Sequence, residues 1–121
     1  MLHSKFAKMI QKKWAVIRSR WLRRLHLDFY LAGYNAGIKW DCYHEPKPKK
    51  PNILAFDWNK GLRVGIGAQG FNAGYYWSPE KGERQPQIPA RLPAILAAAW
   101  HDGFRNGVGL AQWEERWSTP D

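Results

Sequence analysis

The chain has 121 residues, 8 of them Trp, with a formal net charge of +9 and an apolar share of 45%. These values predict one folded domain with a modest core and exclude a disordered chain. Cys42 is the only cysteine, and no apolar run is long enough to span a membrane. We therefore expect no internal disulfide, no integral membrane association and a cytoplasmic location.

The first predicted element is an amphipathic helix whose N-terminal segment, residues 1–27, carries +8 of the net charge and no Asp or Glu. Six apolar side chains in it are spaced by three or four residues, which places them on one helical stripe. They are Phe6, Ile10, Trp14, Ile17, Trp21 and Leu25. Most of the cations fall on the opposite side. Those that we predict to contact nucleic acid are Lys5, Lys8, Lys12, Lys13, Arg18, Arg20, Arg23 and Arg24.

The absence of acidic residues from 1–27 favours an anionic partner. Opposite charges at i,i+4 spacing would stabilise a helix, whereas this segment forgoes such pairs and accepts repulsion between its cations. RNA would relieve that repulsion and release counterions, so we predict RNA as the partner and binding that weakens as salt rises. An anionic membrane surface or an acidic protein would also relieve it. The plainest alternative is the solvated outer face of an ordinary packed helix.

Two Pro-rich stretches, residues 45–51 and 78–93, predict extended linkers. The fold is therefore expected to be all-α, with three helices at 4–41, 54–77 and 92–117. The first helix either runs as one rod, bent at Gly33, or breaks near Asp28, which suits an N-cap. The apolar stripe continues in phase through this region and favours one rod.

Two sequence motifs recur in the same order and indicate a tandem duplication of a unit of about 40 residues. Gly-aromatic-Asn-Ala-Gly followed by Trp occurs at 33–40 and 70–77, and Trp-x-x-Gly-x-Arg-x-Gly occurs at 58–65 and 100–107. The middle helix would then belong to both units. The predicted organisation is one domain over 1–121, with a basic extension at 1–27, a first unit at 28–66 and a second at 67–117.

Each motif contains two glycines four residues apart, which lie on one face of a helix and let another backbone approach closely. A glycine inside a helix costs about 0.5–1 kcal/mol relative to Ala, and tight packing would offset this loss. We predict close packing at Gly33, Gly37, Gly61, Gly65, Gly70, Gly74, Gly103 and Gly107. The competing interpretation places turns at Gly65, Gly67 and Gly70.

The aromatic residues divide between the predicted core and the predicted surface. Because small residues beside large ones fill tight helix pairs, the tryptophans of the repeated motifs are expected in the core. These are Trp40, Trp58, Trp77 and Trp100. Trp113 and Trp117 are expected to pack on the first helix. The candidates for base stacking or partner contact are Tyr43, Tyr75 and Tyr76. Further candidate phosphate contacts in the first linker are Lys47, Lys49 and Lys50.

No residue pattern predicts catalysis or cofactor binding. The four histidines and the cysteine do not show zinc-ligand spacing, and no serine lies in a nucleophile motif. Gly65-x-Gly67-x-x-Gly70 is similar to a dinucleotide-binding fingerprint, but no βαβ unit is predicted around it. We therefore expect a binding protein and not an enzyme, with no cofactor and no metal site.

The motifs resemble those of bacterial ribosome modulation factor, a family with a Gly-Tyr-x-Ala-Gly helix, a Cys-Pro linker and a Trp-x-x-Gly helix. The resemblance covers residues 29–66 best, through Gly33, Tyr34, Ala36, Gly37, Cys42, Pro46, Trp58 and Gly61. It recurs over 67–108, through Gly70, Phe71, Ala73, Gly74, Pro79, Trp100 and Gly103. Family members are small basic proteins that bind ribosomal RNA and help to inactivate ribosomes. The resemblance implies a two-helix unit and a ribosome-associated, RNA-binding protein that modulates translation.

This chain departs from the family in three respects. It holds two units instead of one, three residues separate Cys42 from Pro46, and the second linker carries Glu80 and Glu83 and no cysteine. A duplicated form of this kind suits a phage or a mobile element. The alternative prediction is therefore an inhibitor of that origin that binds a host protein through its aromatic face. The sequence leaves the oligomeric state open.

Overall fold

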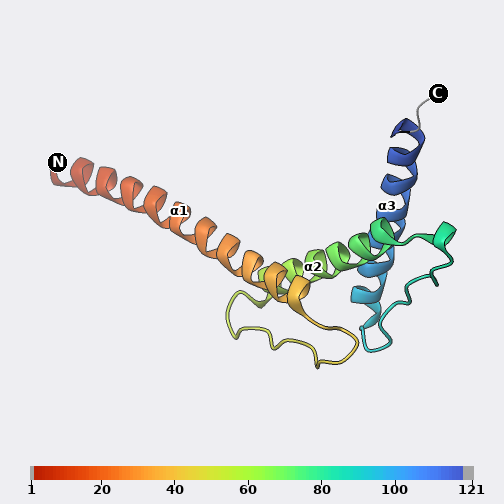
Figure 1. Cartoon of the computed structure of the whole chain (residues 1–121). Helices are drawn as coiled ribbons and strands as arrows, with labels where there is room; N and C mark the ends of the chain where they lie inside the picture. The colour runs from red at the N-terminus through yellow and green to blue at the C-terminus, as the bar shows by residue number, and fades with distance from the viewer. Residues whose placement is uncertain (1, 119–121) are drawn as a thin grey trace.

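The structure, a computed structural model, describes residues 2–118, with side chains for residues 4–118, as three long helices (Figure 1). They are α1 (Leu2–Lys39), α2 (Ala55–Tyr76) and α3 (Ala94–Ser118), and a short 3-10 helix, η1 (Pro79–Lys81), lies between α2 and α3. No β-strand occurs in this part of the chain. The predicted all-α class and its three helices are confirmed. The outermost residues of the domain predicted over 1–121 lie outside the described residues.

α1 is one continuous helix, so the alternative break near Asp28 does not occur. Figure 1 shows that its N-terminal half projects away from the rest of the molecule. α2 contacts both α1 and α3, whereas α1 and α3 do not contact each other within the described residues. Trp113 and Trp117, which were expected on α1, are instead 56% and 71% exposed on α3. That prediction was wrong because α2 lies between the outer helices and the last turns of α3 lead away from both (Figure 1).

Glycines line both helix crossings. A Cβ atom built on Gly37 would lie 2.6 Å from the carbonyl oxygen of Leu62, and one built on Gly65 would lie 2.5 Å from that of Tyr34. Real Cβ atoms essentially never come within 3.0 Å of such atoms, so any larger residue would push the helices apart. The same overlap arises at every glycine of the repeated motifs, namely Gly33, Gly37, Gly61, Gly65, Gly70, Gly74, Gly103 and Gly107.

The crossing of α2 with α3 repeats the crossing of α1 with α2. Gly33 lies against the backbone of Trp58, and Gly70 lies against the backbone of Trp100, which are matching positions of the two motif pairs. α2 therefore supplies one helix to each crossing. The glycines between 65 and 70 lie inside α2, so the turn interpretation of this stretch was wrong.

In the first crossing, the contacts advance in the same direction along both helices. Gly33 and then Gly37 of α1 meet Trp58 and then Leu62 of α2. The first linker, residues 40–54, must therefore carry the chain back along the helix pair before α2 begins. This return path explains why the linker is long, and its prolines favour the extended backbone that such a path needs.

The core lies where the helix crossings meet the two linkers. Its buried apolar side chains are Trp40, Cys42, Trp58, Leu62, Ile66, Leu92, Leu96, Trp100 and Phe104. Three of the four tryptophans expected in the core are thus buried, and Trp77 is half-buried with its ring centroid 5.8 Å from that of Phe104. None of these residues comes from the projecting half of α1. That half is therefore not needed to complete the core.

Gln69 of α2 caps the C-terminal end of α1. Its side-chain amide donates to the carbonyl oxygens of Gly37 at 2.5 Å and Trp40 at 2.7 Å, and so satisfies acceptors that a helix end leaves free. The side-chain oxygen of Gln69 accepts a weak hydrogen bond from the thiol of Cys42 at 3.7 Å. Cys42 is fully buried, and this burial raises the pKa of its thiol. The cap thereby ties the start of the first linker to α2.

Candidate nucleic-acid interface

The N-terminal arm, residues 4–25, is the part of α1 that extends past α2 (Figure 1). It contains no Gly or Pro and is rich in residues that favour helix. All eight cations predicted to bind nucleic acid, from Lys5 to Arg24, are exposed. The apolar stripe is exposed as well, with Phe6 at 60%, Trp14 at 65% and Trp21 at 62%. The arm therefore presents a basic side and an aromatic side to solvent.

The arm meets the helical core at a hydrogen bond between His26 and Asp57. Nδ1 of His26 lies 2.6 Å from a carboxylate oxygen of Asp57, in the first turn of α2. A carboxylate at this position also interacts favourably with the N-terminal end of the helix dipole. Among the described residues, none of the Lys and Arg side chains of the arm forms an ion pair. Their charges therefore remain available to an external anion.

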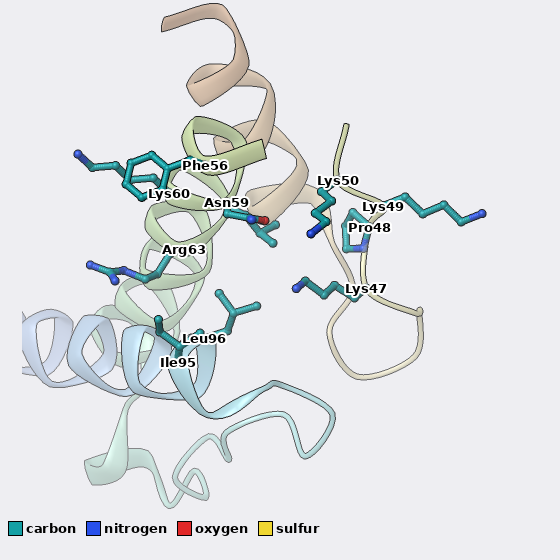
Figure 2. A pocket seen from close by; sticks show the side chains of 11 residues that line it. Lys47, Pro48, Lys49, Lys50, Phe56, Asn59, Lys60, Arg63, Ile95 and Leu96 are labelled. Atoms are coloured by element: carbon teal, nitrogen blue, oxygen red, sulfur yellow. The ribbon is translucent and has the colours of Figure 1, made fainter. Parts of the chain in front are cut away.

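A second basic region, which we name the basic hollow, lies between the first linker and α2 (Figure 2). Its volume is about 840 Å³. The three linker cations named by the sequence, Lys47, Lys49 and Lys50, all line it, together with Lys60 and Arg63 of α2. None of these five cations forms an ion pair within residues 4–118, and no acidic side chain lines the hollow.

The remaining wall of the basic hollow is largely apolar. Leu62 and Leu96, which are 1% and 4% exposed, form its base, whereas Phe56 and Ile95 are 79% and 61% exposed. Because the Phe56 ring is so exposed to water, it can contact a ligand without any rearrangement of the core. The hollow thus combines positive charge with an accessible aromatic ring.

Sequence reasoning missed the contribution of α2 to this site. Phe56, Lys60 and Arg63 are spaced by four and three residues, a signal that they share one helical face. Nothing in the sequence brings that face and residues 47–50 to the same hollow, however, because the arrangement depends on the return path of the first linker.

The three candidate tyrosines do not gather at one site. Tyr43 donates its hydroxyl hydrogen to the carbonyl oxygen of Gln87 at 2.8 Å and so joins the two linkers. Tyr75 donates to Glu114 of α3 at 2.5 Å, and this hydrogen bond raises the pKa of the Tyr75 hydroxyl. Tyr76 is 72% exposed and meets Tyr75 edge-on, with ring centroids 4.9 Å apart. Tyr76 therefore offers the most accessible ring of the three.

No group of three His, Cys, Asp or Glu side chains within residues 4–118 is placed to hold a metal ion. None of the helices in the described part of the chain has both the length and the apolar character needed to cross a bilayer. What the exposed surface does offer is concentrated positive charge beside aromatic rings.

Comparison of the chain with protein-family models, curated protein sequences and solved structures gives no match. The resemblance to ribosome modulation factor therefore rests on the motifs alone, and a function has to be inferred from the two basic surfaces.

Proposed function

We propose that this protein binds RNA through the N-terminal arm and the basic hollow. The observation that supports this most directly is the charge of the arm: the segment 1–27 that contains it has no acidic residue, and the eight cations of the arm are exposed. Neutralising RNA phosphates with these cations would release counterions, and this release would supply most of the binding free energy. The motif resemblance extends the proposal to ribosomal RNA and to modulation of translation.

The shape of the arm suits contact with a phosphate backbone. A helix rises 1.5 Å per residue, so the arm presents its cations over about 30 Å. Lys5, Lys8 and Lys12 lie on the side away from the apolar stripe, at spacings that place them on one face. Contacts of this kind position a protein on nucleic acid without reading its sequence. We therefore propose binding with little dependence on base sequence.

A charge-neutralising variant of the arm tests this proposal. Changing Lys12, Lys13, Arg23 and Arg24 together to Gln should abolish measurable RNA binding at physiological salt in a fluorescence anisotropy titration, because the main cluster of phosphate contacts is lost. All four side chains are exposed, so the far-UV circular dichroism spectrum should still be that of a folded helical protein.

The matched control removes the same formal charge elsewhere, at Lys81, Arg84, Arg105 and Arg116, which are also exposed. This variant should keep most of its affinity, since only its general electrostatic attraction changes. If the two variants lose affinity equally, net charge alone governs binding and the arm is not the interface.

A second candidate function is docking of a host protein on the apolar stripe of the arm. The observation that favours it is the exposure of Trp14 and Trp21, which RNA phosphates would leave uncovered. The fitting occupant is an amphipathic helix with acidic flanks, because Arg20 and Arg24 lie beside the stripe. Aromatic side chains commonly dominate the free energy of such interfaces.

Affinity purification from a bacterial lysate, with and without ribonuclease, separates the two functions. Under the RNA proposal, ribosomes or ribosomal RNA co-purify and ribonuclease removes them. A discrete acidic protein that survives ribonuclease and is lost from a Trp14→Ala, Trp21→Ala variant would establish the second function instead. Sedimentation of the purified protein with anionic vesicles, together with an absence of RNA binding, would point to a lipid surface and overturn both.

A further inference from the structure

We propose that the basic hollow holds an unpaired nucleotide of a single-stranded RNA segment, with the base on Phe56 and the flanking phosphates on the surrounding cations. This inference rests on the proposed RNA binding and assigns a distinct role to a part of the surface outside the arm. It names both a ligand class and the ring that recognises it.

The backbone conformation of the first linker determines where its lysine side chains point. Pro46, Pro48 and Pro51 favour a polyproline II conformation, which has three residues per turn. Lys47 and Lys50 are three residues apart and therefore point to the same side. Figure 2 shows both side chains turned toward α2, whereas Lys49 points away from the hollow. The prolines thus hold two ammonium groups across the hollow from α2 at little entropic loss.

The part of the hollow formed by α2 supplies both charge and a stacking surface, with side chains that Figure 2 shows on the side of the helix away from the linker lysines. Phe56, Lys60 and Arg63 lie on one face of α2, and Ile95 approaches from the start of α3 (Figure 2). The 79% exposure of Phe56 leaves its ring free to stack on a base, an interaction open to every base because each has a π-face. A volume of about 840 Å³ falls within the range of about 300–1,000 Å³ that is usual for ligand sites.

The charge and the apolar base of the hollow together favour a single strand over a duplex. The residues that line the hollow include five cations, of which Lys49 turns its side chain away, and no acid, which disfavours a purely apolar or a cationic ligand. Duplex RNA could present phosphates to Lys47 and Lys50, but its bases are stacked and paired and could not reach Phe56. Only an unpaired nucleotide uses both the charge and the ring.

The test compares a short single-stranded RNA with a duplex of the same length, using the full-length protein and anisotropy at fixed salt. Phe56→Ala should weaken single-strand binding by about 5- to 100-fold and leave duplex binding unchanged, in keeping with the contribution of one base–aromatic stack. Phe56→Trp should retain single-strand affinity. The matched control is Ile53→Ala, which removes another exposed apolar side chain, 62% exposed, outside the hollow.

Failure of this inference can be told apart from failure of the proposed function. If the wild-type protein binds neither RNA, both are overturned. If it binds RNA in a salt-dependent manner but Phe56→Ala has no effect, or weakens single-strand and duplex binding equally, only the assignment of the hollow is overturned. Full competition by free adenosine monophosphate at an equal nucleotide concentration would assign the hollow to a mononucleotide and overturn its role in holding a strand.

Discussion

A Cβ atom added to Gly61 would overlap the backbone carbonyl of Tyr30, and one added to Gly103 would overlap the backbone carbonyl of Gly67. At such positions the hydrogen atom of glycine sets the distance between helices. Gly61→Ala or Gly103→Ala should therefore lower the free energy of unfolding by about 1–3 kcal/mol, the usual effect of overpacking. Chemical denaturation followed by circular dichroism would measure this change.

The chain provides its own control for that experiment. Gly109 also lies inside α3, but a Cβ atom added there meets nothing within 4 Å. Gly109→Ala should raise the free energy of unfolding by up to about 1 kcal/mol, because Ala favours helix more than Gly does. Equal stability of Gly61→Ala and Gly109→Ala would show that the helices can separate without loss.

The reactivity of the Cys42 thiol measures whether the core around this single residue stays closed. It is fully buried, and burial raises the pKa of its thiol, so little reactive thiolate forms near neutral pH. We predict that a thiol reagent such as Ellman's reagent modifies the native protein far more slowly than protein unfolded in guanidinium. Rapid modification of the native protein would mean that the first linker opens readily and exposes this side chain.

Among the elements, α1 divides into a packed half and a projecting half with different expected stabilities. Isolated helices are marginal in water, and the arm also carries repulsion between like charges. In hydrogen–deuterium exchange, amides of residues 4–24 should exchange much faster than those of residues 58–74, and RNA should slow the arm selectively. Strong protection of the arm without RNA would show that another partner, such as a second copy of the chain, already covers it.

The end of α1 depends on a side chain from the next helix. Gln69→Leu removes the donor that α2 provides to the carbonyl oxygens of Gly37 and Trp40. The Gly37 carbonyl oxygen would then lose this partner and the Trp40 oxygen would keep only the weak bond from the Cys42 thiol, so the free energy of unfolding should fall by about 1–3 kcal/mol. Gln112→Leu, at an exposed position of α3, is the matched control and should change thermal stability little. Equal effects of the two substitutions would argue against the cap.

The helices themselves could be predicted because their signals are local. Prolines mark both linkers, and glycines at a spacing of four beside tryptophans indicate close helix crossings before any partner is known. The path of the chain between the helix crossings has no such local signal in the sequence. Trp113 has the same helical periodicity whether it packs on α1 or faces solvent, and only the position of α2 between the outer helices decides that it is exposed.

The candidate site could be predicted only in part, for the same reason. The arm is recognisable from its composition, since its eight cations and the absence of acids belong to one segment. The basic hollow joins residues of the first linker with residues of α2 and one residue pair of α3, and Phe56 receives its proposed role only because residues 47–50 return to line the same hollow. A contact between distant segments of this kind leaves no periodic pattern in the sequence from which it could be predicted.

At the scale of the whole molecule, the two basic surfaces lie near the same end of α2. The arm ends beside the first turn of α2, where His26 contacts Asp57, and Phe56 in that same turn lines the hollow. A single RNA strand could therefore contact both surfaces at once. If it does, the number of phosphates contacted should depend on RNA length, because a short strand can occupy only one surface.

The salt dependence of binding measures that number. For single strands, the slope of log affinity against log salt concentration is about −0.7 per phosphate neutralised. On a long strand, and at salt concentrations low enough for the variants to retain measurable binding, the slope should therefore become less steep by up to about 3 in the Lys12, Lys13, Arg23 and Arg24 to Gln variant. It should become less steep by about 1 in a Lys47→Gln, Lys50→Gln variant. The combined variant should show both changes together, because the two sets of contacts are independent. On a strand too short to span both surfaces, the two changes cannot both appear at full size. If the combined variant on the long strand shows no larger change than the arm variant alone, the hollow makes no phosphate contacts and the arm accounts for all of the binding.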